Sequence, residues 1–200
     1  MRVEHRPSTS IRIGLLCATA LVLAAPAVAA QTRGGLWFGG GIGLGFGRAR
    51  CDVCMNDRNG AISGYARLGG TISPAFLLGI EADGWTRSEE DLRFDMGAIH
   101  AVGLWYPSPT SPWFVKVGFG VIGYRLDDDD GDEDQDDAIT AFSVGGQFGA
   151  GYDLHLAGGV SVTPFVNFLG SIGAELKQQD DTLADVSLTL IQIGLGLTLN

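Results

Sequence analysis

Few residues of this chain could do chemistry, and two of them form a C-x-x-C pair. Of the three cysteines, Cys51 and Cys54 are the two that follow residue 30. In a cytosolic α/β protein this spacing would suggest redox chemistry, and with further ligands it would be half of a zinc site. No histidine lies nearby in the sequence. For an exported chain we predict a structural disulfide between Cys51 and Cys54, with free thiols or metal binding as the alternatives.

A strongly acidic segment, residues 127–137, carries nine carboxylates interrupted by Gly131 and Gln135. Crowded carboxylates suit Ca²⁺ or Mg²⁺, but an EF-hand loop with Gly131 at its sixth position would begin at Leu126, which cannot ligate an ion. We predict a solvated loop that repels anions and binds divalent cations weakly. The net charge of −10 argues against a nucleic acid partner, because phosphate binding requires clustered Lys and Arg.

Catalysis has little support in the sequence. A serine hydrolase requires a His beside a Ser, yet His5 lies close to the N-terminus and the alternation along residues 92–106 places His100 on the apolar face. His155 faces the other way, at the end of its segment far from the charged connections. The glycine-rich run 39–47 lacks the G-x-G-x-x-G spacing of a dinucleotide site, and no helix follows it. We predict no enzymatic activity, with no catalytic residue, metal centre or cofactor.

The N-terminus has the composition of a secretory signal. Arg2, Arg6 and Arg12 are followed by an apolar run over residues 13–25 and by the small residues 27–30. We predict that residues 1–30 are a signal peptide for the general export pathway and that residues 31–200 form one domain.

The last segment of the chain, residues 186–199, indicates the fold class. From Ile191 to Leu199 every odd position is apolar and the even positions are small or polar, which is the period of a β-strand with two different faces. Upstream, Val186, Leu188 and Leu190 are apolar in the opposite phase, and we predict a β-bulge at Leu190-Ile191 that restores one face. The whole run exceeds the about 9–11 residues with which a tilted strand crosses a bilayer.

The same alternation predicts eight strands, which lie at residues 36–48, 61–72, 76–87, 92–106, 113–125, 139–155, 160–176 and 186–199. We expect an all-β, eight-stranded antiparallel up-and-down transmembrane β-barrel, because in lipid only a closed sheet pairs every backbone group. In the strand at 92–106 we assign Met96, Val102 and Tyr106 to the outer face, and Arg93 and Asp95 to the lumen.

The connections alternate in character. Those at 73–75, 107–112 and 157–159 are short and uncharged, whereas those at 51–60, 88–91, 127–137 and 177–185 are charged and mostly longer. Since outer-membrane barrels have short periplasmic turns and longer extracellular loops, both chain ends are expected in the periplasm. Aromatic residues near the strand ends, such as Tyr106 and Trp113, are expected to form interfacial girdles.

In its strand pattern, strand count and N-terminal signal, the chain resembles the small eight-stranded outer-membrane β-barrels, namely the OmpA-like transmembrane domain and the OmpX-like barrels. The resemblance covers residues 36–200. It implies the bacterial outer membrane as location and, as partners, outer-membrane lipid, lipopolysaccharide and the barrel-assembly machinery. Barrels of this kind usually end on an aromatic residue, whereas this chain ends Leu199-Asn200. Some are lipid-modifying enzymes.

An eight-stranded barrel is just wide enough for side chains to fill its interior. We expect the lumen to be filled by the bulky residues Tyr65, Trp85, Trp105, Phe114 and Phe165. The turn at 73–75 is expected to set Ile72 opposite Phe76, Arg67 opposite Glu81 and Tyr65 opposite Asp83, and the turn at 157–159 to set Gln147 opposite Asn167.

We predict that four charged residues form a lumen network that braces and plugs the barrel, namely Arg67, Glu81, Asp83 and Lys116. The expected function is a structural or surface-interaction role. A narrow channel for small solutes is the first alternative, and an outer-membrane lipid-modifying enzyme is the second.

Overall fold

The structure is a computed structural model and describes residues 33–50, 59–89, 92–128, 139–171, 173–178 and 181–200. The chain divides into two units between residues 30 and 31, and all described residues belong to the second unit. The predicted signal peptide, Cys51 and Cys54, and residues 129–137 of the acidic segment lie outside the described residues.

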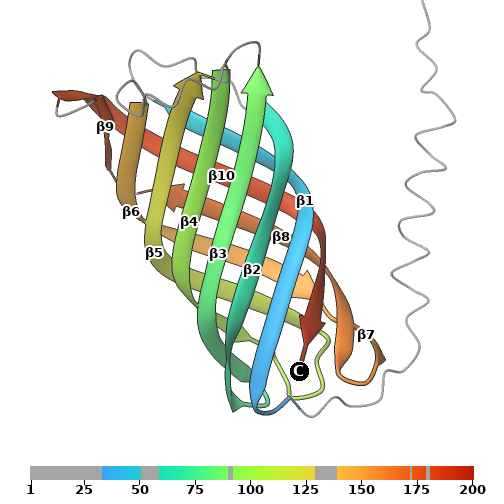
Figure 1. The fold of residues 1–200 in the computed structure, drawn as a ribbon. Coiled ribbons are helices and arrows are strands. Elements are labelled where there is room, and N and C mark those ends of the chain that lie inside the picture. Colours follow the sequence, from blue (N-terminus) through green and yellow to red (C-terminus); the bar gives the residue numbers. More distant parts are fainter. Residues whose placement is uncertain (1–32, 51–58, 90–91, 129–138, 172, 179–180) are drawn as a thin grey trace, which may run out of the picture. The chain divides into compact units, whose positions relative to one another are not determined.

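Within the described residues, ten antiparallel strands close into a barrel (Figure 1). Each strand pairs with its neighbours, and β1 pairs with β10 along almost its whole length. Because β7 follows β6 after Asp153 and β9 follows β8, the ten strands make an eight-stranded barrel, which confirms the predicted fold class. The strands are β1 (Leu36–Arg50), β2 (Asn59–Ser73), β3 (Phe76–Glu89), β4 (Leu92–Trp105), β5 (Trp113–Asp128), β6 (Ile139–Tyr152), β7 (Leu154–Ala157), β8 (Val160–Ser171), β9 (Ala174–Gln178) and β10 (Asp181–Leu199).

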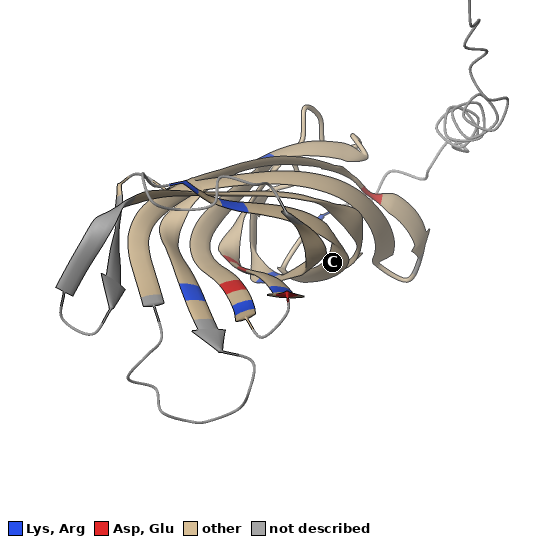
Figure 2. Ribbon diagram, turned by 90° about the horizontal axis from the view of Figure 1, so that it is seen from above, with Lys and Arg blue, Asp and Glu red and all other residues tan. Residues whose placement is uncertain are grey.

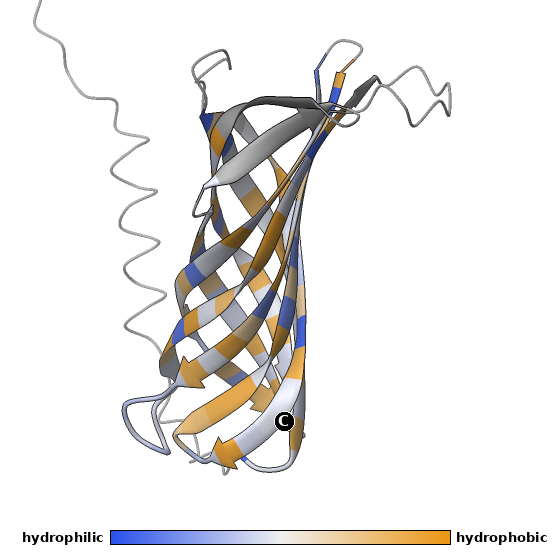
Figure 3. Cartoon of the chain, turned by 90° about the vertical axis from the view of Figure 1, so that its left-hand side faces the viewer, coloured by the Kyte–Doolittle hydropathy of each residue, from blue (hydrophilic) through white to orange (hydrophobic). Residues whose placement is uncertain are grey.

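The outer face of this barrel is apolar. Along the strands, hydrophobic residues follow one another in turn with hydrophilic ones (Figure 3). Outward side chains stay well exposed although they are large and apolar, among them Ile42, Ile62, Phe119, Phe142 and Leu195. A water-exposed surface would not carry so continuous an apolar area, so this face is suited to lipid. Among the described residues, no helix is long and apolar enough to cross a membrane.

The two ends of the barrel differ. Arg33, Asn200 and the turns 74–75, 107–112 and 158–159 gather at one end, which we call the turn end. Backbone hydrogen bonds join these segments, from Tyr106 to Ala75, from Asp153 to Pro112 and from Asn200 to Gly159. The opposite end, which we call the loop end, carries the connections between β1 and β2, β3 and β4, β5 and β6, and β9 and β10.

The face assignment of β4 from the sequence is wrong. Met96, Val102 and Leu104 are buried in the lumen, whereas Trp105 is about half exposed and Ile99 faces outward. Trp105 therefore does not fill the lumen. The alternation misled because β4 carries apolar residues on both faces.

Charged residues of β4 lie on the face opposite to the predicted one. Arg93 is exposed and Asp95 is partly exposed, and their side chains form an ion pair with Nε and Oδ2 3.0 Å apart. They lie near the loop end of β4, where an outward charge reaches past the apolar belt.

The predicted bulge at Leu190-Ile191 is absent from β10. The register with β1 and with β8 continues through both residues without a shift. The upstream apolar residues Val186, Leu188 and Leu190 instead point inward and pack in a cluster with Trp85, Met96, Ile122 and Leu169. The change of phase in the sequence thus marks an apolar layer inside the barrel, and the irregularity of β10 lies between Thr182 and Ala184.

Registers near the turns are only partly as predicted. Arg67 lies opposite Glu81 and Tyr65 opposite Asp83, as expected. Phe76 pairs with Ser73 rather than Ile72, because the register shifts between Thr71 and Ser73.

The predicted pairing of Gln147 with Asn167 is also wrong. Gln147 pairs with Leu169, and Asn167 pairs with Gly149. The turn after β7 contains two glycines in the left-handed region, Gly158 and Gly159, and the β7–β8 register shifts beside it. A turn of this kind changes the register, so counting residues from it gave a pairing displaced by two positions.

The inward glycines of β1 make room for large side chains. A Cβ atom on Gly41 would lie 2.6 Å from the Tyr65 ring and 2.9 Å from the Phe165 ring, and one on Gly45 would lie 2.5 Å from Trp85. These contacts are shorter than van der Waals distances. The glycine face therefore lets the lumen be filled by aromatic residues from other strands.

We predict that Gly41→Val destabilises the refolded barrel by about 1–3 kcal/mol, because an overpacked interior forces its neighbours to shift. Gly84→Val is the matched control, since a Cβ there meets nothing within 4 Å. Urea unfolding of both variants measures the difference. Equal midpoints for the two variants would contradict the proposed role of the glycine face.

Candidate functional site

Buried charges lie in the middle of the lumen. The Lys116 ammonium of β5 donates a hydrogen bond to Glu81 Oε1 of β3, and both side chains are buried. Arg67 Nη1 lies 4.0 Å from Glu81 Oε2, and Arg67 Nη2 donates to Thr198 Oγ1 at 3.1 Å. The carboxylate of Glu81 thus faces two cations, which offsets the high cost of removing it from water.

Asp83 and His100 extend this charged layer. His100 Nδ1 lies 3.6 Å from Asp83 Oδ2, and His100 is also the direct cross-strand neighbour of Glu81. The sequence analysis placed His100 on the lipid face, which is wrong, since it is fully buried in the lumen. The β3–β4 register could have revealed it, because the Glu89–Leu92 pair beside the short connection sets Glu81 opposite His100.

All four predicted network residues therefore lie in the lumen, in two groups. Glu81 contacts Lys116 and lies near Arg67, whereas Asp83 lies beside His100. The Asp83 carboxylate oxygens and both His100 ring nitrogens have no hydrogen-bond partner among the described residues.

Apolar clusters border the charged layer on both sides. Towards the turn end lie Trp37, Leu77, Val102, Leu104, Tyr106 and Phe114, and towards the loop end lies the cluster built on Trp85 and Leu188. The inward residues of β3 follow this order, from Leu77 through Glu81 and Asp83 to Trp85. Viewed from above, charged residues are sparse on the described strands (Figure 2).

A hydrogen-bonded chain runs from the charged layer to the turn end. Thr198 shares a hydrogen bond with Thr163 at 3.1 Å, and Thr163 donates to Asp153 Oδ1 at 2.7 Å. The Tyr106 hydroxyl donates to Asp153 Oδ2 at 2.8 Å. The sequence analysis assigned Tyr106 to the outer face, but it is fully buried just beyond β4. Burial, together with the Asp153 carboxylate, raises the pKa of Tyr106, so its hydroxyl remains a donor.

One histidine and one serine of the barrel are cross-strand neighbours near the turn end. His155 of β7 lies opposite Ser161 of β8. However, neither Ser161 Oγ nor His155 Nδ1 has a hydrogen-bond partner among the described residues, so the Ser–His hydrogen bond of a hydrolase is not formed. Over all the residues that the structure describes, His, Cys, Asp and Glu form no group of three or more that could hold a metal ion.

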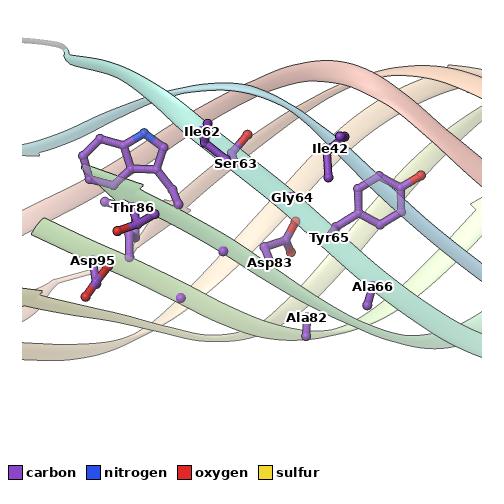
Figure 4. A pocket seen from close by; sticks show the side chains of 14 residues that line it. Ile42, Ile62, Ser63, Gly64, Tyr65, Ala66, Ala82, Asp83, Thr86 and Asp95 are labelled. Carbon is purple, nitrogen blue, oxygen red and sulfur yellow. The ribbon is translucent and has the colours of Figure 1, made fainter. Parts of the chain in front are cut away.

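In the barrel wall, a groove of about 610 Å³ crosses β1–β4 (Figure 4). Gly64, Gly84 and Gly97 are neighbours across β2, β3 and β4, and their missing side chains leave this depression. The exposed side chains of Ile42 and Ile62 lie beside it. The lining also includes residues that belong to the lumen side of the wall, namely Ser63, Tyr65, Asp83, Trp85 and Met96, so the glycines make the wall between the outer face and the lumen thin at this place.

Comparison with known proteins agrees with this architecture. Solved structures with a similar fold include Neisserial surface protein A (NspA), at a TM-score of 0.56 and 13% identity over 82% of this chain and 98% of that one. Another is Ail, the attachment invasion locus protein of Yersinia pestis, at a TM-score of 0.50 and 13% identity over 84% of this chain and 100% of that one. Ail has also been solved with the heparin analogue sucrose octasulfate, and that structure matches at a TM-score of 0.53.

No curated protein matches the sequence. Residues 15–198 match the family described as "Outer membrane protein beta-barrel domain". The match covers most of the chain, and the closed eight-stranded barrel is the fold that it implies. The chain therefore belongs to the outer membrane protein beta-barrel domain family, whose place is the bacterial outer membrane.

Proposed function

We propose that this protein is a structural or surface-interaction barrel of the outer membrane whose lumen is filled with side chains and does not conduct. The observation that carries this proposal is the buried contact between Lys116 and Glu81, which joins β5 to β3 inside the barrel. An open pore would hydrate both charges. Here their side chains are withdrawn from solvent and held between two apolar clusters.

The packing of the lumen supports the same conclusion. The largest fully buried side chains include Trp37, Tyr106, Phe114 and Lys116, and all of them point inward. Tyr65 and Phe165 meet edge to face, with ring centroids 4.8 Å apart, beside the charged layer. A barrel of eight strands leaves little room beyond such side chains.

The turn end is assigned to the periplasm and the loop end to the cell exterior. Short turns and both chain ends are typical of the periplasmic side of bacterial barrels, and longer connections of the outer side. The acidic segment 127–137 then lies outside the cell. Its nine carboxylates would repel a polyanion such as the one found with Ail, so the partner we propose for it is weakly bound Ca²⁺ or Mg²⁺.

Three further partners belong to the proposal. The apolar outer face contacts outer-membrane lipid and lipopolysaccharide, and the barrel-assembly machinery inserts the chain.

Cys51 and Cys54 are proposed to form a disulfide in the oxidising compartment that the first loop reaches.

A narrow channel remains the second candidate, because specific lumen groups favour it. Asp83, His100 and Gln147 are polar, buried and without hydrogen-bond partners among the described residues. Such groups are normally paired or hydrated, so a file of water in this layer would satisfy them. Conductance distinguishes this candidate from the filled lumen.

We predict that the refolded full chain, inserted in a planar lipid bilayer, gives no steady conductance step. Glu81→Ala is expected to give intermittent openings, because it removes the partner of Lys116 and leaves space in the layer. Arg93→Ala, which changes an exposed charge near the loop end, is expected to behave as the parent. A steady step from the parent protein would favour the channel instead.

We also predict strong energetic coupling between Glu81 and Lys116. Glu81→Gln and Lys116→Met should each lower the free energy of unfolding by about 3–5 kcal/mol, because each breaks the buried pair by removing one partner. The double variant should be less destabilised than the sum of the two, as a double-mutant cycle in urea measures. The surface pair Arg93 and Asp95, of which Asp95 is partly exposed, supplies the control cycle, with an expected coupling below about 1 kcal/mol. Equal coupling in both cycles would contradict a bracing role.

Orientation is tested on intact cells. A protease that cleaves after acidic residues should cut within 127–137 without disruption of the outer membrane, because this segment is proposed to lie outside. The same cleavage sequence inserted into the turn 107–112 should be cut only after permeabilisation. The reverse pattern would overturn the assignment of both ends.

A further inference from the structure

Arg33, which precedes β1, fills the turn end of the lumen with its side chain. Only 5% of this residue is exposed. Its guanidinium donates from Nη2 to the Ser111 carbonyl at 2.6 Å and from Nη1 to the Pro109 carbonyl at 3.0 Å. A longer hydrogen bond of 3.5 Å reaches the Pro74 carbonyl. One side chain thus joins the N-terminal segment to two different turns.

The same guanidinium covers an aromatic ring. Arg33 Cζ lies 3.5 Å from the centroid of the Tyr106 ring, which is a close cation–π contact. Tyr106 in turn lies against Phe114, with ring centroids 5.3 Å apart. On the inner side, Arg67 Cζ lies 5.2 Å from the Phe114 centroid and 5.6 Å from that of Trp37. An aromatic layer therefore lies between two guanidinium groups, one towards the lumen and one towards the turns.

The backbone of the segment is held in place as well. Gly35 has a φ of 78°, which other residues rarely adopt, and its carbonyl accepts a hydrogen bond from the Thr71 amide at 2.9 Å. The turn that Arg33 binds is anchored on its other side, because the Asp153 amide donates to the Pro112 carbonyl at 2.7 Å. The Tyr106 hydroxyl, which lies under the Arg33 guanidinium, donates to Asp153. Arg33 is thereby connected to the hydrogen-bonded chain that runs through Thr198 to Arg67.

We infer that residues 33–35 form a releasable strap, with Arg33 as its closing group, that seals the turn end of the lumen. The contacts are of a kind that can be released. They consist of hydrogen bonds to backbone carbonyls and one cation–π contact, and no carboxylate pairs with the guanidinium among the contacts described. Release of the strap would expose Tyr106 and the polar chain behind it from the turn end, while the cluster at the loop end stays closed.

A thiol probe at the turn end tests this inference. In the refolded full chain with Cys17, Cys51 and Cys54 changed to Ser, Leu77→Cys puts a thiol in the fully buried turn-end cluster. Arg33→Ala should speed its labelling by a small maleimide about tenfold or more, because hydrogen bonds from a charged donor are lost. With Arg33→Lys, the labelling rate should lie between those with Arg33 and with Arg33→Ala. An ammonium keeps the charge but lacks the planar fork with which a guanidinium reaches two carbonyls.

A second probe separates local opening from general destabilisation. Ala141→Cys lies in the loop-end cluster, and its labelling rate should be the same with Arg33 and with Arg33→Ala. Arg93→Ala, which alters an exposed arginine near the loop end, should change neither rate. Unchanged labelling of Leu77→Cys, or an equal increase at both probes, would overturn the inference.

The inference builds on the proposed filled lumen but fails separately from it. Arg33→Ala is expected to open only the turn end, so the labelling changes without steady conductance. Conductance by the parent protein would overturn the filled lumen. The labelling rates of Leu77→Cys with Arg33 and with Arg33→Ala would still test the strap. Unchanged labelling in a non-conducting barrel would overturn the strap alone.

Discussion

Closure of the sheet is the constraint on which the other features of this barrel depend. In lipid a strand edge has no water to bond, so β1 must pair with β10, and it does so over thirteen consecutive residue pairs. Closing eight strands sets a narrow interior. The inward face of every strand then has to share that space, which explains why β1 carries glycines where Tyr65, Trp85 and Phe165 from other strands need room.

A narrow interior also restricts which charges it can hold. Arg67 and Lys116 are balanced by Glu81 and Asp83, and the one contact with direct hydrogen bonding, between Lys116 and Glu81, lies between apolar layers. Buried charges require such pairing, because an unpaired one would lose its hydration without compensation. Asp83 and His100 are the part of this layer with weaker pairing, which makes them the place where water would first enter the lumen.

The sequence predicts the strand number, the class and most faces, because alternation is strict wherever one face meets lipid and the other is small or polar. It fails where both faces are apolar. Met96, Val102 and Leu104 of β4, and Leu188 and Leu190 of β10, are apolar because they pack inside the barrel. Alternation cannot distinguish an apolar interior from lipid, and His100 was misplaced with its strand. Asn167 was paired wrongly because two glycines with positive φ change the register beside the turn.

The two ends of the lumen are sealed by different physical means. At the loop end Val186, Leu188 and Leu190 close the interior with apolar contacts, and the described members of this cluster all belong to strands of the wall. At the turn end the apolar cluster is completed by Arg33, a residue from outside the strands that binds backbone carbonyls of two turns. A seal made by one side chain opens when that side chain leaves, whereas the apolar cluster has no single group on which its closure depends. The turn end is therefore the end whose closure depends on a single side chain, as the proposed strap requires.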